Sequence, residues 1–172
     1  GIEYSRNLMT VRIAKTLGLT KILDLSSKLD IYEEIPELLS VSLGAAETSL
    51  LNLTAAYASF VNGGEKIKPN LITRIQDRRG KTIFKLEDRS CVGCDKFLNT
   101  SEEYPYIKHT NERVFSEETA YQVTSILEGV VQRGTGKKLK DLKVPLAGKT
   151  GTTNKNFDAW FIGYSSNLVI GV

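Results

Sequence analysis

The residues of this chain best suited to chemistry are Lys149, Thr150, Gly151 and Thr152, which follow one another directly. A lysine ammonium and two threonine hydroxyls can donate to a carboxylate or to a developing oxyanion. Gly151 has no Cβ, so the backbone of a ligand can come close to the chain at that point. The segment therefore predicts an edge that receives a peptide with a free carboxylate.

A second polar set lies near the start of the chain, where Ser5 and Asn7 flank Arg6. The apolar-rich residues 8–14 that follow are typical of a helix start. Serine and asparagine are favoured N-cap residues, so each of the two could simply cap that helix. Because the lysine-threonine-glycine segment lies downstream, a catalytic interpretation is favoured over the cap.

These two sets resemble elements of a known family. Lys149-Thr-Gly151 and Ser5-Arg-Asn7 are similar to the Lys-Thr-Gly and Ser-x-Asn signatures of the serine penicillin-recognising enzymes. Four longer stretches resemble class A, bifunctional penicillin-binding proteins, in the family's order: residues 42–64, 115–136, 147–153 and 158–164. The resemblance covers nearly the whole chain and implies a penicillin-binding-protein/β-lactamase-like transpeptidase fold, in which helices pack on an antiparallel sheet.

The resemblance also implies an activity. Such a domain is a D,D-transpeptidase, whose serine attacks the penultimate carbonyl of a D-Ala-D-Ala stem peptide of peptidoglycan and passes the acyl group to an amine. β-Lactams are the family's inhibitors, and no metal or cofactor is expected. By residue-level match, Ser5 would relay a proton, Asn7 would hold the peptide amide, and Lys149 would supply positive potential.

The remaining matched positions are implied to bind substrate. Thr150 and Thr152 would bind the terminal carboxylate beside Gly151, and the backbone N–H of Thr152 would form half of an oxyanion hole. Loss of one such donor costs about 10²–10³ in rate.

The family's third signature, the Ser-x-x-Lys that carries the nucleophile, is absent from this sequence, since no serine is followed three positions later by a lysine. In the family this motif precedes Ser-x-Asn, so we expect the nucleophile upstream of residue 1. Both chain ends are interpreted as boundaries within a longer transpeptidase domain, of which residues 1–172 are the C-terminal portion. The chain alone is therefore predicted not to bind penicillin covalently.

Other classes of protein fit less well. A phosphate-binding loop needs Gly-x-x-x-x-Gly-Lys-Ser/Thr, but Lys143 stands where the first glycine belongs, and an aromatic strand rather than a helix follows. A β-lactamase shares Lys-Thr-Gly but not the longer segments. A D,D-carboxypeptidase, which uses water as acceptor, and a non-catalytic penicillin-sensing or peptide-binding module both remain open.

The apolar pattern predicts the elements that position these residues. Residues 48–62 and a stretch capped by Ser116 read as helices, ended by Gly63 and Gly134. Residues 69–86 predict a hairpin that turns at 77–80. Strand-like residues lie on both sides of the lysine-threonine-glycine segment, at 144–148 and 158–164, and residues 160–172 predict a hairpin broken at 165–167. An α+β fold follows.

Residues 85–113 are polar and lack periodicity, which predicts an insertion within the domain. They contain Cys91 and Cys94, a spacing compatible with half a zinc site, a redox motif or a local disulfide. His109 alone cannot complete a zinc set, and no βαβ pattern surrounds the pair. We favour two exposed cysteines without a catalytic role, with oxidation plausible outside the cytoplasm.

Composition excludes little. At 172 residues and 41% hydrophobic the chain can form one core, and a net charge of +3 without a basic stripe does not indicate nucleic-acid binding. No run of about 18 apolar residues is present. The resemblance implies a parent with an N-terminal membrane anchor and a glycosyltransferase domain, facing the periplasm or the extracytoplasmic side of the membrane.

Overall fold

The computed structural model describes residues 1–86, 91–92, 106–107, 111–153 and 157–172. The chain divides into two compact units. One comprises Gly1–Ile67 and Glu112–Val172, and the other is Lys68–Asn111. The first contains the residues expected to form the site.

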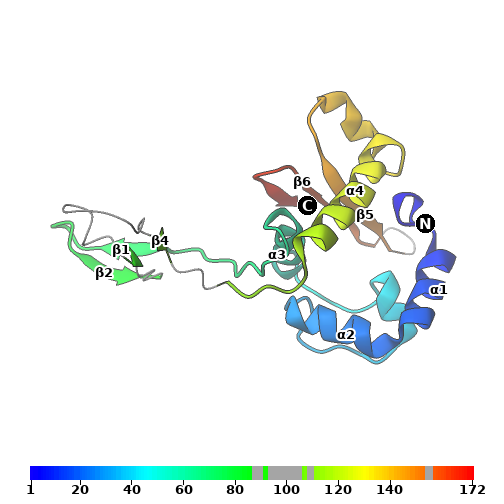
Figure 1. Ribbon diagram of the computed structural model, residues 1–172, viewed down its shortest axis with the longest axis horizontal. Helices are drawn as coiled ribbons and strands as arrows, with labels where there is room; N and C mark the ends of the chain where they lie inside the picture. Colours follow the sequence, from blue (N-terminus) through cyan, green and yellow to red (C-terminus); the bar gives the residue numbers. More distant parts are fainter. Residues whose placement is uncertain (87–90, 93–105, 108–110, 154–156) are drawn as a thin grey trace. The chain divides into compact units, whose positions relative to one another are not determined.

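The first unit begins with helices (Figure 1). A short 3-10 turn, η1 (Ile2–Tyr4), precedes α1 (Asn7–Leu17) and α2 (Leu19–Lys28). Gly18 separates the two helices with φ 88°, a conformation that a residue with a Cβ rarely adopts. The helix start after residue 7 was predicted, whereas α2 was not.

A 3-10 turn, η2 (Leu39–Leu43), leads to α3 (Leu50–Val61), which confirms the helix predicted over 48–62. The Ser49 hydroxyl accepts a hydrogen bond from the Asn52 N–H at 3.1 Å and so satisfies one of the free donors at the helix start. Gly63 follows the helix with φ 62°.

The second predicted helix is α4 (Glu117–Gln132). Its N-cap is Ser116, as expected, and the hydroxyl accepts from the Thr119 N–H at 3.3 Å. Its buried face includes Leu127, Val130 and Val131. A 3-10 turn, η4 (Lys137–Leu142), connects the helix to the sheet.

The sheet of this unit has three antiparallel strands, β5 (Ala147–Thr152), β6 (Ala159–Tyr164) and β7 (Val169–Gly171), in that order. The β6–β7 pair confirms the predicted C-terminal hairpin. The strand predicted over 144–148 instead begins at Ala147 and continues through the lysine-threonine-glycine segment. Pro145 has no N–H to donate to a strand ladder, which fits the later start.

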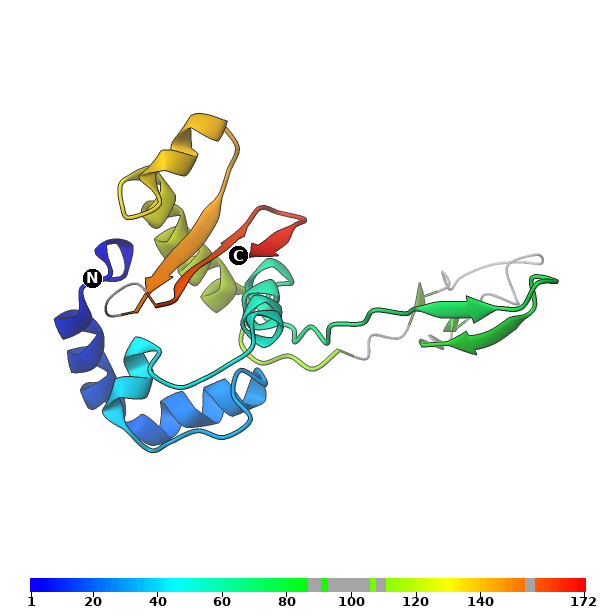
Figure 2. The ribbon, with the colours of Figure 1, turned by 180° about the vertical axis from the view of Figure 1, so that it is seen from behind.

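The core of this unit lies where the helices meet the sheet. α4 contacts β5, and α3 contacts β6 and β7 (Figure 2). Leu127, Val130, Ala147 and Tyr164 form the buried cluster. Burial of these apolar side chains holds the sheet against α4, at about 25 cal/mol per Å² of apolar area removed from water.

The second unit contains the predicted hairpin, formed by β1 (Arg74–Gln76) and β2 (Thr82–Lys85). The Asp77 carboxylate orders its turn by accepting from the N–H groups of Arg79 at 2.8 Å and Lys81 at 2.9 Å. A shorter antiparallel pair joins β3 (Cys91–Val92) to β4 (Tyr106–Ile107). Cys94 and His109 lie outside the described residues, as does the Cys91 side chain.

Helices and antiparallel sheets together confirm the predicted α+β class. Among the residues with described structure, no helix has the length and hydropathy needed to cross a bilayer.

Candidate active site

The structure brings Ser5 and Lys149 together, although 144 positions separate them in the chain. The Lys149 ammonium donates to the Ser5 hydroxyl with Nζ and Oγ 2.5 Å apart, and also to the Thr150 carbonyl at 2.7 Å. The two polar sets singled out in the sequence thus meet through Ser5 and Lys149, whereas no hydrogen bond joins the described Asn7 or Thr152 side chain to the other set. A hydroxyl beside a lysine ammonium releases its proton more easily than a hydroxyl in water, because the nearby positive charge favours the alkoxide.

Burial lowers the pKa of Lys149 from its ordinary value, because the charged ammonium loses hydration. No described acidic side chain forms an ion pair with this lysine that would counter the effect. Its ammonium is therefore a positive charge whose only described hydrogen-bond acceptors are neutral oxygens.

Ser5 has an uncommon backbone conformation, with φ 51° and ψ 46°. A residue with a Cβ is disfavoured in this left-handed region, and such residues cluster at functional sites. The turn is closed by local hydrogen bonds from the Ser5 N–H to the Ile2 carbonyl and from the Arg6 N–H to the Gly1 carbonyl, each at 3.0 Å. The left-handed turn comes directly before α1 begins at Asn7.

Asn7 is the first residue of α1 and is exposed. The N-cap position is Arg6, and no side chain caps this helix end. The alternative in which Ser5 or Asn7 is the N-cap of α1 is therefore wrong. Within the described residues the Asn7 side chain makes no hydrogen bond, so its amide is available to a ligand.

The other expected residues lie on β5. Its partner is β6, in a register that opposes Gly151 to Trp160 and Thr152 to Ala159. In the part of the chain that the structure describes, no strand pairs with the other edge of β5. An edge strand of this kind presents free N–H and C=O groups to an extended peptide.

Gly151 and Gly148 differ in what they pack against. A Cβ built at Gly148 would lie 2.7 Å from the Phe161 ring and 2.8 Å from the Ile162 carbonyl oxygen, so the fold requires glycine there. A Cβ at Gly151 would meet only Trp160, at 3.9 Å, which is ordinary contact. The internal packing of β5 therefore does not require a glycine at 151, and the backbone there is open to the close approach of another chain.

One residue near the site was missed from the sequence. The Thr135 hydroxyl lies 2.7 Å from the Thr150 hydroxyl, a hydrogen bond that connects the turn after α4 to β5. The glycines on both sides of Thr135 marked a turn, but nothing in their spacing indicated contact with a strand 15 positions later. Thr152, by contrast, is exposed at the end of its strand.

An apolar hollow of about 540 Å³ adjoins Lys149. It is lined by side chains from α2, α3 and α4, such as Leu25, Leu53 and Leu127, and by Leu29 at the end of α2. Lys149, a residue of β5, thus lines one side of the apolar hollow.

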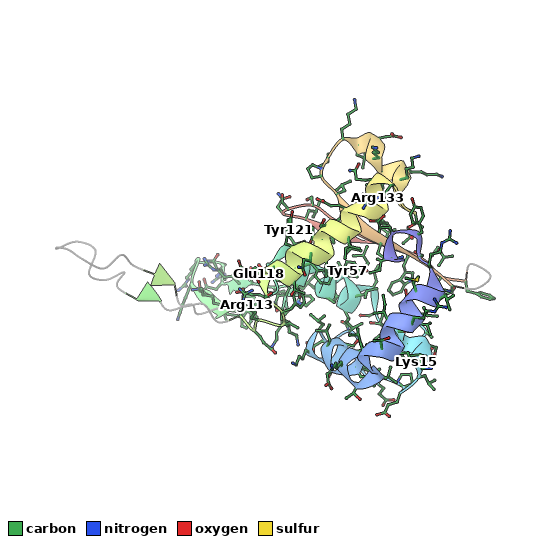
Figure 3. All side chains as sticks on the ribbon, turned by 45° about the vertical axis from the view of Figure 1, so that its right-hand side comes forward. Lys15, Tyr57, Arg113, Glu118, Tyr121 and Arg133 are labelled. Carbon is green, nitrogen blue, oxygen red and sulfur yellow. The ribbon has the colours of Figure 1, made fainter. Side chains whose placement is uncertain are left out.

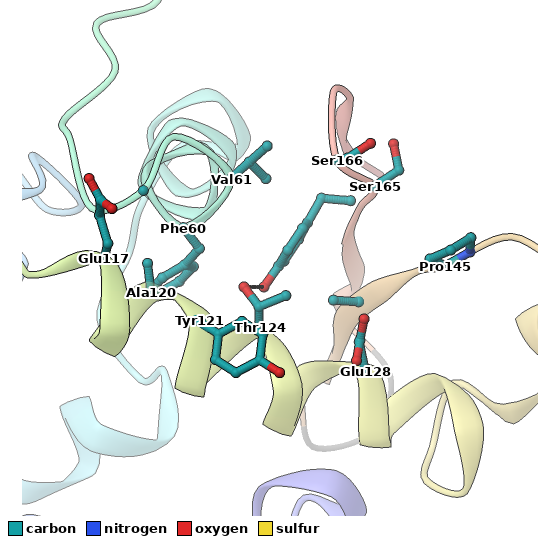
Figure 4. A pocket seen from close by; sticks show the side chains of 13 residues that line it. Phe60, Val61, Glu117, Ala120, Tyr121, Thr124, Glu128, Pro145, Ser165 and Ser166 are labelled. Carbon is teal, nitrogen blue, oxygen red and sulfur yellow. Dashed lines mark hydrogen bonds between the residues drawn. The ribbon is translucent and has the colours of Figure 1, made fainter.

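A second concavity, of about 370 Å³, lies between α3, α4 and the end of β6 (Figure 4). Across it the Thr124 and Tyr164 hydroxyls are 3.1 Å apart. Burial raises the pKa of Tyr164, and burial together with Tyr164 raises the pKa of Tyr57 to about 12. Both phenols stay protonated at neutral pH, and this concavity contains none of the residues expected to act.

The described residues contain no group of three or more His, Cys, Asp or Glu side chains placed to hold a metal ion. Donors and hydroxyls, rather than carboxylate or imidazole ligands, make up the candidate site.

Comparisons with known proteins agree on one family. The family profile described as penicillin binding protein transpeptidase domain matches residues 1–169. Penicillin-binding protein 1A of Rickettsia conorii is 42% identical over 99% of this chain and 22% of its own length. Penicillin-binding protein 1A of Pseudomonas aeruginosa is 31% identical over 98% of this chain and 24% of its own. The chain thus spans between a fifth and a quarter of these relatives.

Solved structures give the same result. Penicillin-binding protein 1A from Haemophilus influenzae has a TM-score of 0.82 and 28% identity, covering 99% of this chain and 28% of that one. The D,D-transpeptidase domain of a peptidoglycan glycosyltransferase from Eggerthella lenta, at 20% identity, has a TM-score of 0.67 and covers 94% of this chain and 43% of that one. The second likeness bears on the fold alone.

Proposed function

The chain belongs to the penicillin-binding protein transpeptidase domain family, and on that premise we propose that it forms part of the active site of a serine D,D-transpeptidase. Its substrates are peptidoglycan stem peptides that end in D-Ala-D-Ala, and β-lactams inhibit it by acylating the same serine. The observation that carries the proposal is the contact between the Lys149 ammonium and the Ser5 hydroxyl, 2.5 Å apart.

The reaction is an acyl transfer in two steps. A serine oxygen attacks the penultimate D-Ala carbonyl carbon, the C–N bond to the terminal D-Ala breaks, and the departing amine takes up a proton. An amine of a neighbouring stem peptide then attacks the ester, loses a proton and releases the serine. Because Ser-x-x-Lys is absent from residues 1–172, we propose that another part of the protein supplies the nucleophile.

Two residues act on protons and charge, and a third binds the donor peptide. Ser5 relays the proton to the departing amine, and its hydroxyl hydrogen-bonds to Lys149. Lys149 contributes positive potential without a carboxylate neighbour to neutralise it, which favours negative charge in the transition state. Asn7, whose amide has no described partner, holds the amide of the donor peptide.

β5 binds the donor peptide. Its free edge pairs with the extended stem peptide, Gly151 permits the close approach, and Thr150 and Thr152 receive the terminal carboxylate. The Thr152 N–H serves as one oxyanion donor. The Thr135 hydroxyl orients Thr150 through their hydrogen bond.

We propose that the segment carrying the nucleophile packs into the apolar hollow. Its leucine walls fit a buried helix, and Lys149 lies at its border, where the attacking serine must arrive. Residues 1–172 are then the C-terminal portion of a longer transpeptidase domain, and the polar stretch at about 85–113 is an insertion in it.

For the whole protein we propose a class A enzyme. It would combine this domain with a glycosyltransferase domain and a single membrane anchor, and would face the periplasm or the extracytoplasmic side of the membrane. The chain covers 22% of the Rickettsia conorii relative, so these further parts would lie outside residues 1–172.

Labelling with a fluorescent penicillin tests the function. The full-length protein is expected to form an adduct that survives denaturing electrophoresis, whereas residues 1–172 alone are expected to form none, since loss of a nucleophile costs on the order of 10⁶ in rate. An adduct on the isolated chain would falsify the assignment of the nucleophile. Transfer to an added amine, compared with release by water, separates a transpeptidase from a carboxypeptidase.

A further inference from the structure

Glu3 connects the turn that carries Ser5 to the C-terminal end of α4. The Arg133 guanidinium donates to both oxygens of the Glu3 carboxylate, from Nε at 2.8 Å and from Nη2 at 2.5 Å. The Glu3 carbonyl also accepts from the Thr135 N–H at 3.1 Å. Figure 3 shows Arg133 at the end of α4, beside the N-terminal turn. Side chain and backbone of Glu3 are thus both held.

Two glycines make room for this contact. A Cβ at Gly129 would lie 2.1 Å from a Glu3 carboxylate oxygen, and a Cβ at Gly134 would lie 2.3 Å from the Glu3 carbonyl oxygen. The Glu3 side chain is only 20% exposed, although that of Arg133 is 63% exposed. The end of α4 is therefore shaped to receive Glu3 closely, which an incidental surface ion pair does not require.

Glu3 lies two positions before Ser5, whose left-handed backbone is disfavoured for a residue with a Cβ. The hydrogen bonds that close the turn are local, so they hold its shape but not its position against the rest of the unit. The contacts of Glu3 supply that position. Without them the turn could move or relax, and Ser5 Oγ would leave Lys149.

Residues 133–135, at the C-terminal end of α4, also contact β5. Thr135, two residues after Arg133, donates its N–H to Glu3 and hydrogen-bonds through its hydroxyl to Thr150 on β5. We propose that Glu3 and Arg133 are positioning residues. They set Ser5 at hydrogen-bonding distance from Lys149, because the Ser5 turn and β5 are both held at the C-terminal end of α4. The inference rests on the proposed function, to which it adds two residues outside the expected motifs.

The test compares acylation rate constants for a fluorescent penicillin in the full-length protein and its variants. Glu3→Gln removes the charge, and Arg133→Lys keeps the charge but loses the two-pronged contact. Glu117→Gln is the matched control, because it breaks an ion pair with Arg113 at the other end of the same helix, where the glutamate is 76% exposed. All variants are also measured for melting temperature and for the fraction labelled at completion.

The expected result is a rate constant lowered roughly tenfold to a hundredfold in Glu3→Gln, less in Arg133→Lys, and unchanged in Glu117→Gln. The fraction finally labelled is expected to stay the same in every variant. A purely structural defect would instead lower this fraction, because it reduces the amount of folded protein and leaves the rate constant of the folded molecules unchanged. Arg133→Lys, altered at an exposed side chain, carries the test if Glu3→Gln fails to fold. Unchanged rate constants in both variants overturn the inference.

A second measurement separates this inference from the proposed function. The NMR signal of Lys149 Cε, recorded with ¹³C-labelled lysine, reports whether Ser5 stays beside the ammonium. We expect it to shift in Glu3→Gln and not in Glu117→Gln, whether or not penicillin reacts. If the wild type is not acylated, the proposed function fails. If the Lys149 signal is the same in all variants, the positioning role fails.

Discussion

At the scale of single residues, the proposed site depends on the Lys149 ammonium, a positive charge at a partly buried position. Lys149 has a lowered pKa because burial removes hydration, and its described acceptors are the Ser5 hydroxyl and the Thr150 carbonyl. A carboxylate neighbour would stabilise the lysine and would also cancel its field. On the proposed function, the absence of a described carboxylate partner leaves the field of Lys149 free to stabilise negative charge in the transition state.

This cost makes stability depend on pH. Between its lowered pKa in the folded protein and its ordinary value near 10.5, Lys149 binds more protons when unfolded, so it makes the free energy of unfolding rise with pH. Lys149→Met removes that contribution. Urea unfolding at several pH values should therefore show wild type gaining stability relative to the variant as pH rises toward 10.5. A constant difference between the two would contradict the burial of this charge.

The two glycines of β5 give a matched pair of substitutions. Gly148→Ala is expected to destabilise the fold by about 1–3 kcal/mol, because the added methyl meets Phe161 and the Ile162 carbonyl. Gly151→Ala is expected to change stability by less than about 0.5 kcal/mol and to slow acylation by penicillin. Urea unfolding and labelling rates of the full-length variants measure both effects. Equal loss of stability in the two would leave the ligand argument for Gly151 without support.

At the scale of elements, local signals were sufficient where periodicity and caps agreed. α3 and α4 were predicted from their apolar periodicity, their terminal glycines and, for α4, the Ser116 cap. The two hairpins were predicted from the turn at 77–80 and the break at 165–167. α2 was not predicted, because only the helix start over residues 8–14 was recognised, and α2 is a separate helix that follows Gly18 at φ 88°. The start of β5 was placed too early because Pro145 was included in the strand.

The cap of α4 bears on the site because, on the inference above, the C-terminal end of this helix holds both the Ser5 turn and β5. Ser116→Ala is expected to lower the free energy of unfolding by about 1 kcal/mol, since the Thr119 N–H loses its acceptor. Ser125→Ala, at an exposed position inside the same helix, is the control and should be neutral or slightly stabilising. Denaturant unfolding of both variants decides. Equal effects would show that the cap contributes nothing.

At the scale of the whole molecule, the site is built from segments far apart in sequence. Local patterns cannot bring Ser5 to Lys149, and only the resemblance to a family indicated that they share a site. The Glu3–Arg133 pair, 130 positions apart, and the Thr135–Thr150 contact carried no sequence signal at all. Charged pairs at long range depend on the final packing, which single-sequence patterns do not encode.

The apolar hollow leads to a prediction about the longer protein. If a segment outside residues 1–172 fills it, Leu25, which is 44% exposed here, becomes buried there. Leu25→Asp should then lower the melting temperature of the full-length protein by about 4 °C or more, because an unpaired charge enters a core. Leu71→Asp, at a fully exposed position of the other unit, is the control. No difference between the two would mean that the hollow stays open to water.

The central claim is that Ser5 and Lys149 act as one catalytic unit, and a double-mutant cycle tests it most directly. Acylation rate constants for a fluorescent penicillin are measured in the full-length wild type, Ser5→Ala, Lys149→Met and the double variant. Each single change should slow acylation strongly, and the double variant should be little slower than the slower single one, because either change already removes the shared contact. Effects that simply multiply would show that the two residues act independently and would contradict the account.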